Sequence, residues 1–230
     1  MNRYSRVLTT RGGALVLAAG LLLGAVAGAA GASTASAKAQ ANKTLLLLTD
    51  MPKGWTAVKH TNGGGGNFPG AKQLAGCIGV ASSLITSNPP SVNSPNFTSK
   101  DQTLEVDDNV SIFHSTKVAH AQYAAISNAK TPACMATLMN TTFKTQIVSG
   151  APKGTTVGTI TVVHAASQKG TSAFAIGAPV SSGGVTLKLN MIMVFFIKGQ
   201  LGEQITYYGY GPVFPASLAA HLTSVAAGRI

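Results

Sequence analysis

Aromatic residues near the C-terminal end of the chain are the clearest candidates for a binding site. Tyr207, Tyr208 and Tyr210 lie close together, and Phe214 follows a Gly-Pro pair a few residues later. Amphipathic rings where a strand meets a helix can line a pocket for a small apolar or amphipathic ligand. Ordinary packing of these rings in the core is the alternative. We therefore treat these four residues as weak candidates for ligand binding.

No catalytic motif is apparent in the sequence. The chain lacks a G-x-S-x-G sequence, and an S-x-x-K match at Ser127-Asn128-Ala129-Lys130 has no companion motifs in the expected order. The five histidines show no metal-binding spacing. We expect a non-enzymatic protein with no metal and no cofactor. A hydrolase whose site is assembled from residues distant in sequence is the alternative.

Four of the six acidic residues lie in one short segment, namely Asp101, Glu105, Asp107 and Asp108. A cation site is one interpretation, but the D-x-D-x-D-G calcium pattern is absent. We favour a solvated acidic strand face, which Glu105 and Asp107 would share. Asp108 falls on the apolar side of the same alternation. This position predicts a β-bulge at residues 107–109.

The two cysteines, Cys77 and Cys134, are predicted to form a disulfide bond. An even number of cysteines in an exported chain favours a bridge. A metal site or a catalytic thiol is the alternative, but no second Cys or His lies at ligand spacing. The bridge would covalently link two segments that are distant in sequence.

The N-terminal segment predicts export from the cell. Arg3, Arg6 and Arg11 precede an uncharged run from Gly12 to Ala32, and two overlapping A-x-A sites follow within residues 35–39. We predict a signal peptide over residues 1–39 and a single secreted α+β domain over residues 40–230, extracellular or associated with the cell wall. An uncleaved membrane anchor is the alternative, because the run approaches the length of a transmembrane helix.

The charge of the chain bounds its partners. The net charge is +11, and four of the positive charges belong to residues 1–39, which leaves +7 for the remainder. These cations are spread almost singly, without the basic cluster and interleaved aromatic residues that nucleic-acid binding requires. We expect no nucleic-acid partner. An anionic envelope polymer is an alternative partner, and membrane contact is expected only through the N-terminal segment if it stays uncleaved.

These residues are positioned by helices in the first half of the chain and by strands in the second half. Alternating or apolar segments predict strands at 104–112, 144–149, 156–166, 171–180, 184–198 and 201–210. Helical spacing appears over 71–85 and again after Phe214. A further helix, capped by Ser115 or Thr116, carries the apolar residues from Val118 to Ile126. The sequence therefore predicts an α+β fold, with a mostly antiparallel sheet of about five or six strands packed against helices and one disulfide.

The order of these features resembles a known group of proteins. The features are an Ala/Gly-rich export signal, the segment from Asp50 to Trp55, Cys77 in a helix, Cys134 in a later helix, and a closing helix from Phe214. Together they resemble secreted actinobacterial domains of uncharacterised function. In outline they are similar to the extracellular sensor domain of mycobacterial serine/threonine kinases and, more loosely, to PsbP-like envelope lipoproteins. The resemblance implies a sensor-like binding module, and it carries over only the two cysteines, as the staple of the fold.

Overall fold

The computed structural model describes residues 31–59, 70–86, 89–145, 148 and 153–230. Most of the apolar run from Gly12 to Ala32 therefore lies outside the described residues, as does the greater part of the predicted signal peptide. Among the helices in the described ranges, none is long and apolar enough to cross a membrane.

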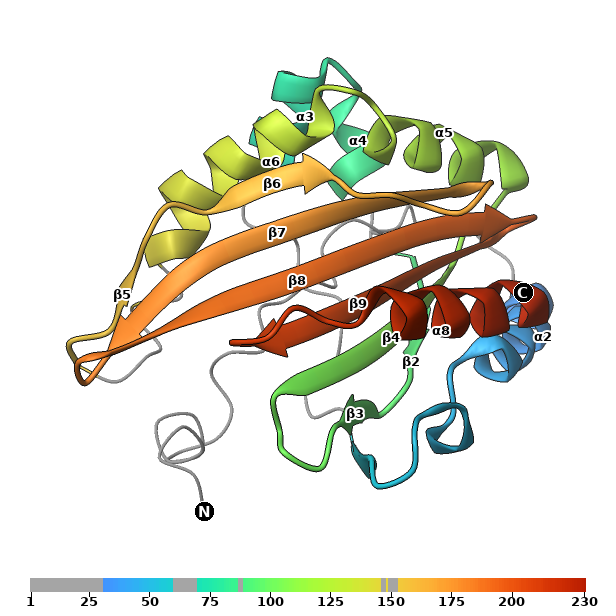
Figure 1. Cartoon of the computed structure of the whole chain (residues 1–230). Coiled ribbons are helices and arrows are strands. Elements are labelled where there is room, and N and C mark those ends of the chain that lie inside the picture. The colour runs from blue at the N-terminus through green and yellow to red at the C-terminus, as the bar shows by residue number, and fades with distance from the viewer. Residues whose placement is uncertain (1–30, 60–69, 87–88, 146–147, 149–152) are drawn as a thin grey trace.

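One antiparallel sheet of nine strands forms the centre of the structure (Figure 1). The strands are β1 (Thr56–Val58), β2 (Ser91–Asn93), β3 (Asn96–Thr98), β4 (Leu104–Ile112), β5 (Thr156–Val157), β6 (Thr161–His164), β7 (Thr171–Ser182), β8 (Val185–Lys198) and β9 (Leu201–Tyr210). Their order across the sheet is β1-β3-β4-β9-β8-β7-β5, with β2 paired to β4 and β6 paired to β7. Strand β4, from the first half of the chain, thus lies beside β9, the last strand.

The long central strands follow from the alternation of their residues. Leu189, Met191, Met193 and Phe195 of β8 are buried on one face, and Val194 and Phe196 are buried on the other. A strand that is apolar on both faces is stable only in the middle of a sheet that is covered on both sides. The turn at Gly199, which has a positive φ of 61°, then returns the chain as β9.

Helices cover both faces of this sheet (Figure 1). The helices are α2 (Gly31–Thr44), α3 (Ala71–Ile78), α4 (Ser82–Thr86), α5 (Thr116–Ile126), α6 (Thr131–Leu138) and α8 (Ala216–Arg229), with short turns η1 (Leu48–Asp50) and η2 (Met139–Phe143). One apolar cluster packs α3 to α6 against the first face. A second cluster packs α2, α8 and the segment after α2 against the opposite face.

The expected α+β class is confirmed, but the predicted number of strands is too low. The sheet has nine strands. Three of them, β1, β2 and β3, were not predicted, because they have three residues each, too few to show an alternation in the sequence. The segment predicted as a single strand at 156–166 forms two short strands. The predicted strand at 144–149 is also wrong at its start, because Lys144 and Thr145 are helical.

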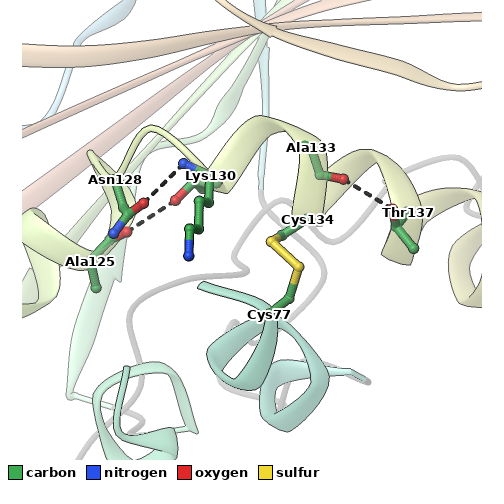
Figure 2. Close-up of a disulfide and its surroundings, with 8 residues drawn as sticks. Cys77, Ala125, Asn128, Lys130, Ala133, Cys134 and Thr137 are labelled. Carbon is green, nitrogen blue, oxygen red and sulfur yellow. Dashed lines mark hydrogen bonds between the residues drawn. A yellow bond between two sulfur atoms is a disulfide. The ribbon is translucent and has the colours of Figure 1, made fainter. Parts of the chain in front are cut away.

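The predicted disulfide between Cys77 and Cys134 is confirmed. It joins α3 to α6, and Figure 2 shows the bond bridging the two helices. Cys134 is buried, whereas Cys77 is exposed. The bridge therefore fixes the outer helical layer, on the face of the sheet opposite α8.

The predicted bulge at residues 107–109 is wrong. The pairing of β4 with β9 runs without interruption from Leu104 opposite Gly209 to Ile112 opposite Leu201. Asp108 therefore keeps the parity of its apolar neighbours, and its side chain is 1% exposed. A carboxyl group is thus buried in the core, whereas the sequence pattern predicted a bulge that would turn it away from the apolar face.

Candidate ligand-binding site

A cluster of carboxylates and tyrosines lies across β4 and β9 on the face covered by α3 to α6. Because side chains alternate along a strand, Glu105 and Asp107 of β4 share this face with Tyr208 and Tyr210 of β9. The Tyr208 hydroxyl donates to Asp107 Oδ2 at 3.1 Å, and the Tyr210 hydroxyl donates to Glu105 Oε2 at 3.2 Å. We call these four residues the carboxylate–tyrosine cluster.

The two rings of this cluster are stacked. Tyr208 and Tyr210 have centroids 6.4 Å apart and planes inclined by 6°. Asn96 of β3 adds a hydrogen bond from Nδ2 to Glu105 Oε1 at 3.0 Å. Tyr208 is 2% exposed, whereas Tyr210 and both carboxylates are partly exposed. The cluster thus has a buried ring at its base and accessible atoms at its outer side.

Electrostatics keep the phenol groups protonated. Burial raises the pKa of Tyr208 and of Tyr210, and the negative charges of Asp107 and Glu105 raise both further. A neutral phenol donates a hydrogen bond to a carboxylate. The cluster can therefore bind a positive or hydrogen-bond-donating group, but its phenols are not activated as nucleophiles.

The four aromatic candidates from the sequence do not form one site. Tyr207 and Phe214 lie on the opposite face, with ring centroids 4.9 Å apart inside the cluster that packs α8. The Tyr207 hydroxyl donates to Ala219 O at 3.1 Å and lies 2.8 Å from Thr223 Oγ1. Tyr208 and Tyr210 lie in the carboxylate–tyrosine cluster. The alternation of adjacent tyrosines along β9 separates the two pairs.

Glu105 and Asp107 are the residues that the sequence did not connect to the tyrosines. The alternation placed them together on one strand face, and this placement is confirmed. The expected solvated face is instead half-buried and hydrogen-bonded to β9. The pairing of β4 with β9 joins segments about a hundred residues apart, and no sequence signal marked that pairing.

A pair of buried carboxyl groups lies on the other face of the same two strands. Asp108 and Glu203 are both 1% exposed and stand diagonally across the β4–β9 ladder. Asp108 Oδ2 accepts a hydrogen bond from Leu46 N at 2.8 Å. Asp108 Oδ1 and both Glu203 oxygens have no hydrogen-bond partner among the described residues. Each carboxyl group instead raises or lowers the pKa of the other through its proximity.

Such a pair holds a proton at neutral pH. Burial raises the pKa of both carboxyl groups, and the charge of Asp108 raises that of Glu203 further. Arg229 lowers both pKa values, but its guanidinium is engaged by Asp50, with contacts of 2.7 Å to both carboxylate oxygens. Protonation removes the charge of a buried carboxyl group, which lowers the cost of burying two acids in the core.

Within the described residues, no group of three or more His, Cys, Asp or Glu side chains could hold a metal ion. His114, His120, His164 and His221 lie in separate parts of the fold and are exposed, and His60 lies outside the described residues. Hydrogen bonds to the acidic segment from described residues include those from tyrosine, serine and threonine hydroxyls, an asparagine amide and a backbone N–H group.

Comparison with known proteins gives a distant structural similarity. No protein-family model matches the chain, and no curated protein sequence matches it. One solved structure that is similar is the extracellular domain of PknH from Mycobacterium tuberculosis, with 9% sequence identity and a TM-score of 0.43. The match covers 84% of this chain and 95% of that chain.

Proposed function

We propose that this chain is an exported, non-enzymatic binding or sensor-like module of the bacterial cell envelope. The proposal places a small amphipathic ligand at the carboxylate–tyrosine cluster. The observation that carries it is the stacked pair Tyr208 and Tyr210, whose hydroxyls are held by two carboxylates at a partly exposed position.

Two features support an extracellular location. The basic start, apolar run and A-x-A sites of residues 1–39 have the layout of an export signal. The Cys77–Cys134 disulfide agrees with this, because such bonds form and persist in oxidising compartments outside the cytoplasm.

The chemistry of the cluster favours a ligand with a positively charged head and an apolar body. Asp107 and Glu105 carry two negative charges side by side on one strand face. The partly exposed ring of Tyr210 offers an electron-rich face beside them, which attracts alkylammonium groups and apolar carbon alike. An anionic ligand would meet like charge at the same position.

A matched set of amphiphiles tests this preference. Decyltrimethylammonium, decyl glucoside and decyl sulfate share one alkyl chain and differ in the charge of the head group. Below their micellar concentrations, titration calorimetry should show the cation binding to the exported protein most tightly and the sulfate most weakly. Equal affinity for all three would contradict the proposal, since the carboxylates would then play no part.

Variants of the cluster locate the binding. Glu105→Gln and Tyr210→Leu should each weaken binding of the cation about tenfold, because a charge or a ring face is lost. Asp101→Asn is the matched control, since this exposed acid lies in the preceding turn and contacts Ser99 and Thr103. If Asp101→Asn weakened binding as much as Glu105→Gln, the charge of the region rather than the cluster would be responsible.

A further inference from the structure

Two buried acids lie beneath the segment that contains the end of α2. Because side chains alternate along a strand, Asp108 of β4 and Glu203 of β9 share the face of the sheet that α2 and α8 cover. Each acid is 1% exposed. Three carboxyl oxygens, Asp108 Oδ1 and both of Glu203, have no hydrogen-bond partner among the described residues. The core therefore encloses two acids without the donors that would stabilise two negative charges.

Residues 40–50, which we call the N-terminal strap, lie over this acid pair. The strap begins in the last turns of α2, which contacts β4 and β2. Its backbone reaches the pair directly, because Leu46 N donates to Asp108 Oδ2 at 2.8 Å. The other strap residues are exposed or partly exposed, and the buried ones are Ala41, Thr44, Leu45 and Leu46. The strap is thus held on the sheet by a short row of side chains and by a bond to one of the acids.

One cation ties the strap to α8. Arg229 donates to Leu45 O at 3.0 Å and to both carboxylate oxygens of Asp50 at 2.7 Å. Its positive charge also acts on Asp108 and Glu203. While the acid pair is neutral, this guanidinium can serve the strap alone. Once the pair is ionised, the pair and the strap compete for the same guanidinium.

We propose that the N-terminal strap is a pH-sensitive closure, which lies on the sheet while Asp108 and Glu203 are protonated and detaches when they ionise. Two charges in a dry core require water or a counter-ion. Lifting the strap admits water to the pair and releases Arg229 to it, at the cost of four buried side chains. Separating β4 from β9 would instead open the middle of the sheet.

The charged groups around the pair set the direction of the response. Burial raises the pKa of Asp108 and of Glu203, and the charge of Asp107 on the opposite face raises that of Asp108 further. Arg229 opposes these effects without cancelling them. Burial also raises the pKa of Tyr207 on the same face, so its phenol stays neutral. The other cationic and histidine side chains of α2, α8 and β8 in the described ranges are exposed, namely Lys38, Lys43, Lys188, Lys198 and His221.

The closed form therefore holds its protons more tightly than an open form in which water reaches the acids. Closure is complete in acid, below the ordinary pKa of a carboxyl group, and it is lost as the pH rises through the raised values of the closed form.

Distances between spin labels test this response in the full chain. Lys43→Cys with Thr186→Cys places one label on the strap and one on β8, and Ser217→Cys with Thr186→Cys is the matched pair for α8; all three residues are exposed. Pulsed electron paramagnetic resonance should give one narrow distance for the strap pair at about pH 5 and a second, longer distance at about pH 9. The α8 pair should keep one distance throughout. A strap distance that is the same at both pH values would overturn the proposal.

Variants of the pair show whether its ionisation is the cause. Asp108→Asn with Glu203→Gln cannot ionise at either position, so the strap should stay closed at both pH values. Asp101→Asn is the control, because this exposed acid lies outside the pair, and it should open like the original chain. Should the double variant not fold, Glu203→Gln alone should still reduce the open fraction at the higher pH. Opening of Glu203→Gln to the same extent as the original chain would contradict the proposal.

Far-ultraviolet circular dichroism distinguishes a moving strap from unfolding of the whole domain. We expect the sheet signal to be the same at both pH values, since the proposal leaves β4, β8 and β9 paired. If the sheet signal were lost, or if the α8 pair lengthened together with the strap pair, the acids would control the fold as a whole and the strap would not be a separate closure.

Discussion

At the scale of single residues, the most informative feature is the carboxyl pair Asp108–Glu203. Each acid is 1% exposed, and burial raises the pKa of both carboxyl groups. Leu46 N occupies the remaining oxygen of Asp108. A buried carboxyl group that stays protonated avoids the free-energy penalty of a buried charge. The unfolded chain would release this proton at neutral pH, so holding it lowers the free energy of unfolding.

The raised pKa values of Asp108 and Glu203 predict that the folded protein loses stability as the pH rises. The pKa of each acid is higher in the folded state than in the unfolded chain, where ordinary carboxyl values near 4 apply. Above about pH 5 the unfolded chain has released these protons and the folded protein has not, so unfolding becomes easier. Denaturant titrations should show the free energy of unfolding falling by about 1 kcal/mol or more between pH 5 and pH 9.

Glu203→Gln isolates the pair as the cause. The amide cannot lose a proton and can still donate to Asp108, so the decline with pH should become shallower. Asp101→Asn is a suitable control, because a hydrogen bond from Ser99 lowers the pKa of Asp101 and it titrates below this pH range. An unchanged slope in Glu203→Gln would show that other groups carry the pH dependence.

At the scale of elements, the disulfide links α3 to α6, and α6 packs directly against the sheet. Helix α6 contacts β6 and buries Cys134, Met135 and Leu138 in the first apolar cluster. Helix α3 is joined to α6 by the Cys77–Cys134 bond and precedes residues 87–88, which lie outside the described residues. The covalent link therefore restrains the unfolded chain across a loop of 57 residues.

Removing this link should lower stability substantially while leaving the sheet in place. In the chain-entropy description, a loop of this length contributes about 4 kcal/mol to the free energy of unfolding. Cys77→Ala with Cys134→Ala should therefore unfold at a clearly lower denaturant concentration, and reduction of the original chain should reproduce the change. A loss below about 1 kcal/mol would indicate that the unfolded chain is already compact around these helices.

At the scale of the whole molecule, two apolar clusters share one sheet, and the N-terminal segment completes the second of them. Ala41, Leu45 and Leu46 are buried against β4 and α8, and Arg229 donates to Leu45 O at 3.0 Å. Residues 35, 36, 38 and 39 are exposed. The predicted cleavage region therefore lies immediately before the first fully buried residue of the core.

Truncation from the N-terminus should reveal this boundary. A chain beginning at Gln40 should retain the thermal stability of the full chain, because the residues it loses between 35 and 39 are mostly exposed. A chain beginning at Leu48 should lose about 3–6 kcal/mol, since three buried apolar side chains and the bond from Leu46 N are removed. Equal melting temperatures of the two chains would show that residues 40–47 do not belong to the core.

Elements with strong periodic or chemical signals could be predicted from the residues alone. The alternation of β8 and β9, a helix capped at Ser115 or Thr116 and the closing helix α8 were predictable, because local residue order dictates them. The structure decides the cap in favour of Ser115. The even cysteine count likewise predicted the bond between Cys77 and Cys134, which is present.

Which of these elements lie side by side could not be predicted in this way, because it depends on the packing of the whole chain. The pairing of β4 with β9 brings Glu105 to Tyr210 and Asp107 to Tyr208, and it buries Asp108 diagonally opposite Glu203 on the other face. Neighbouring residues of one strand thus belong to a partly exposed cluster and to a dry core. The sequence pattern could not show which carboxyl group would be partly exposed and which would be buried. The pKa and the hydrogen-bond partners of a carboxyl group depend on the residues that the opposite strand and the covering helices place around it.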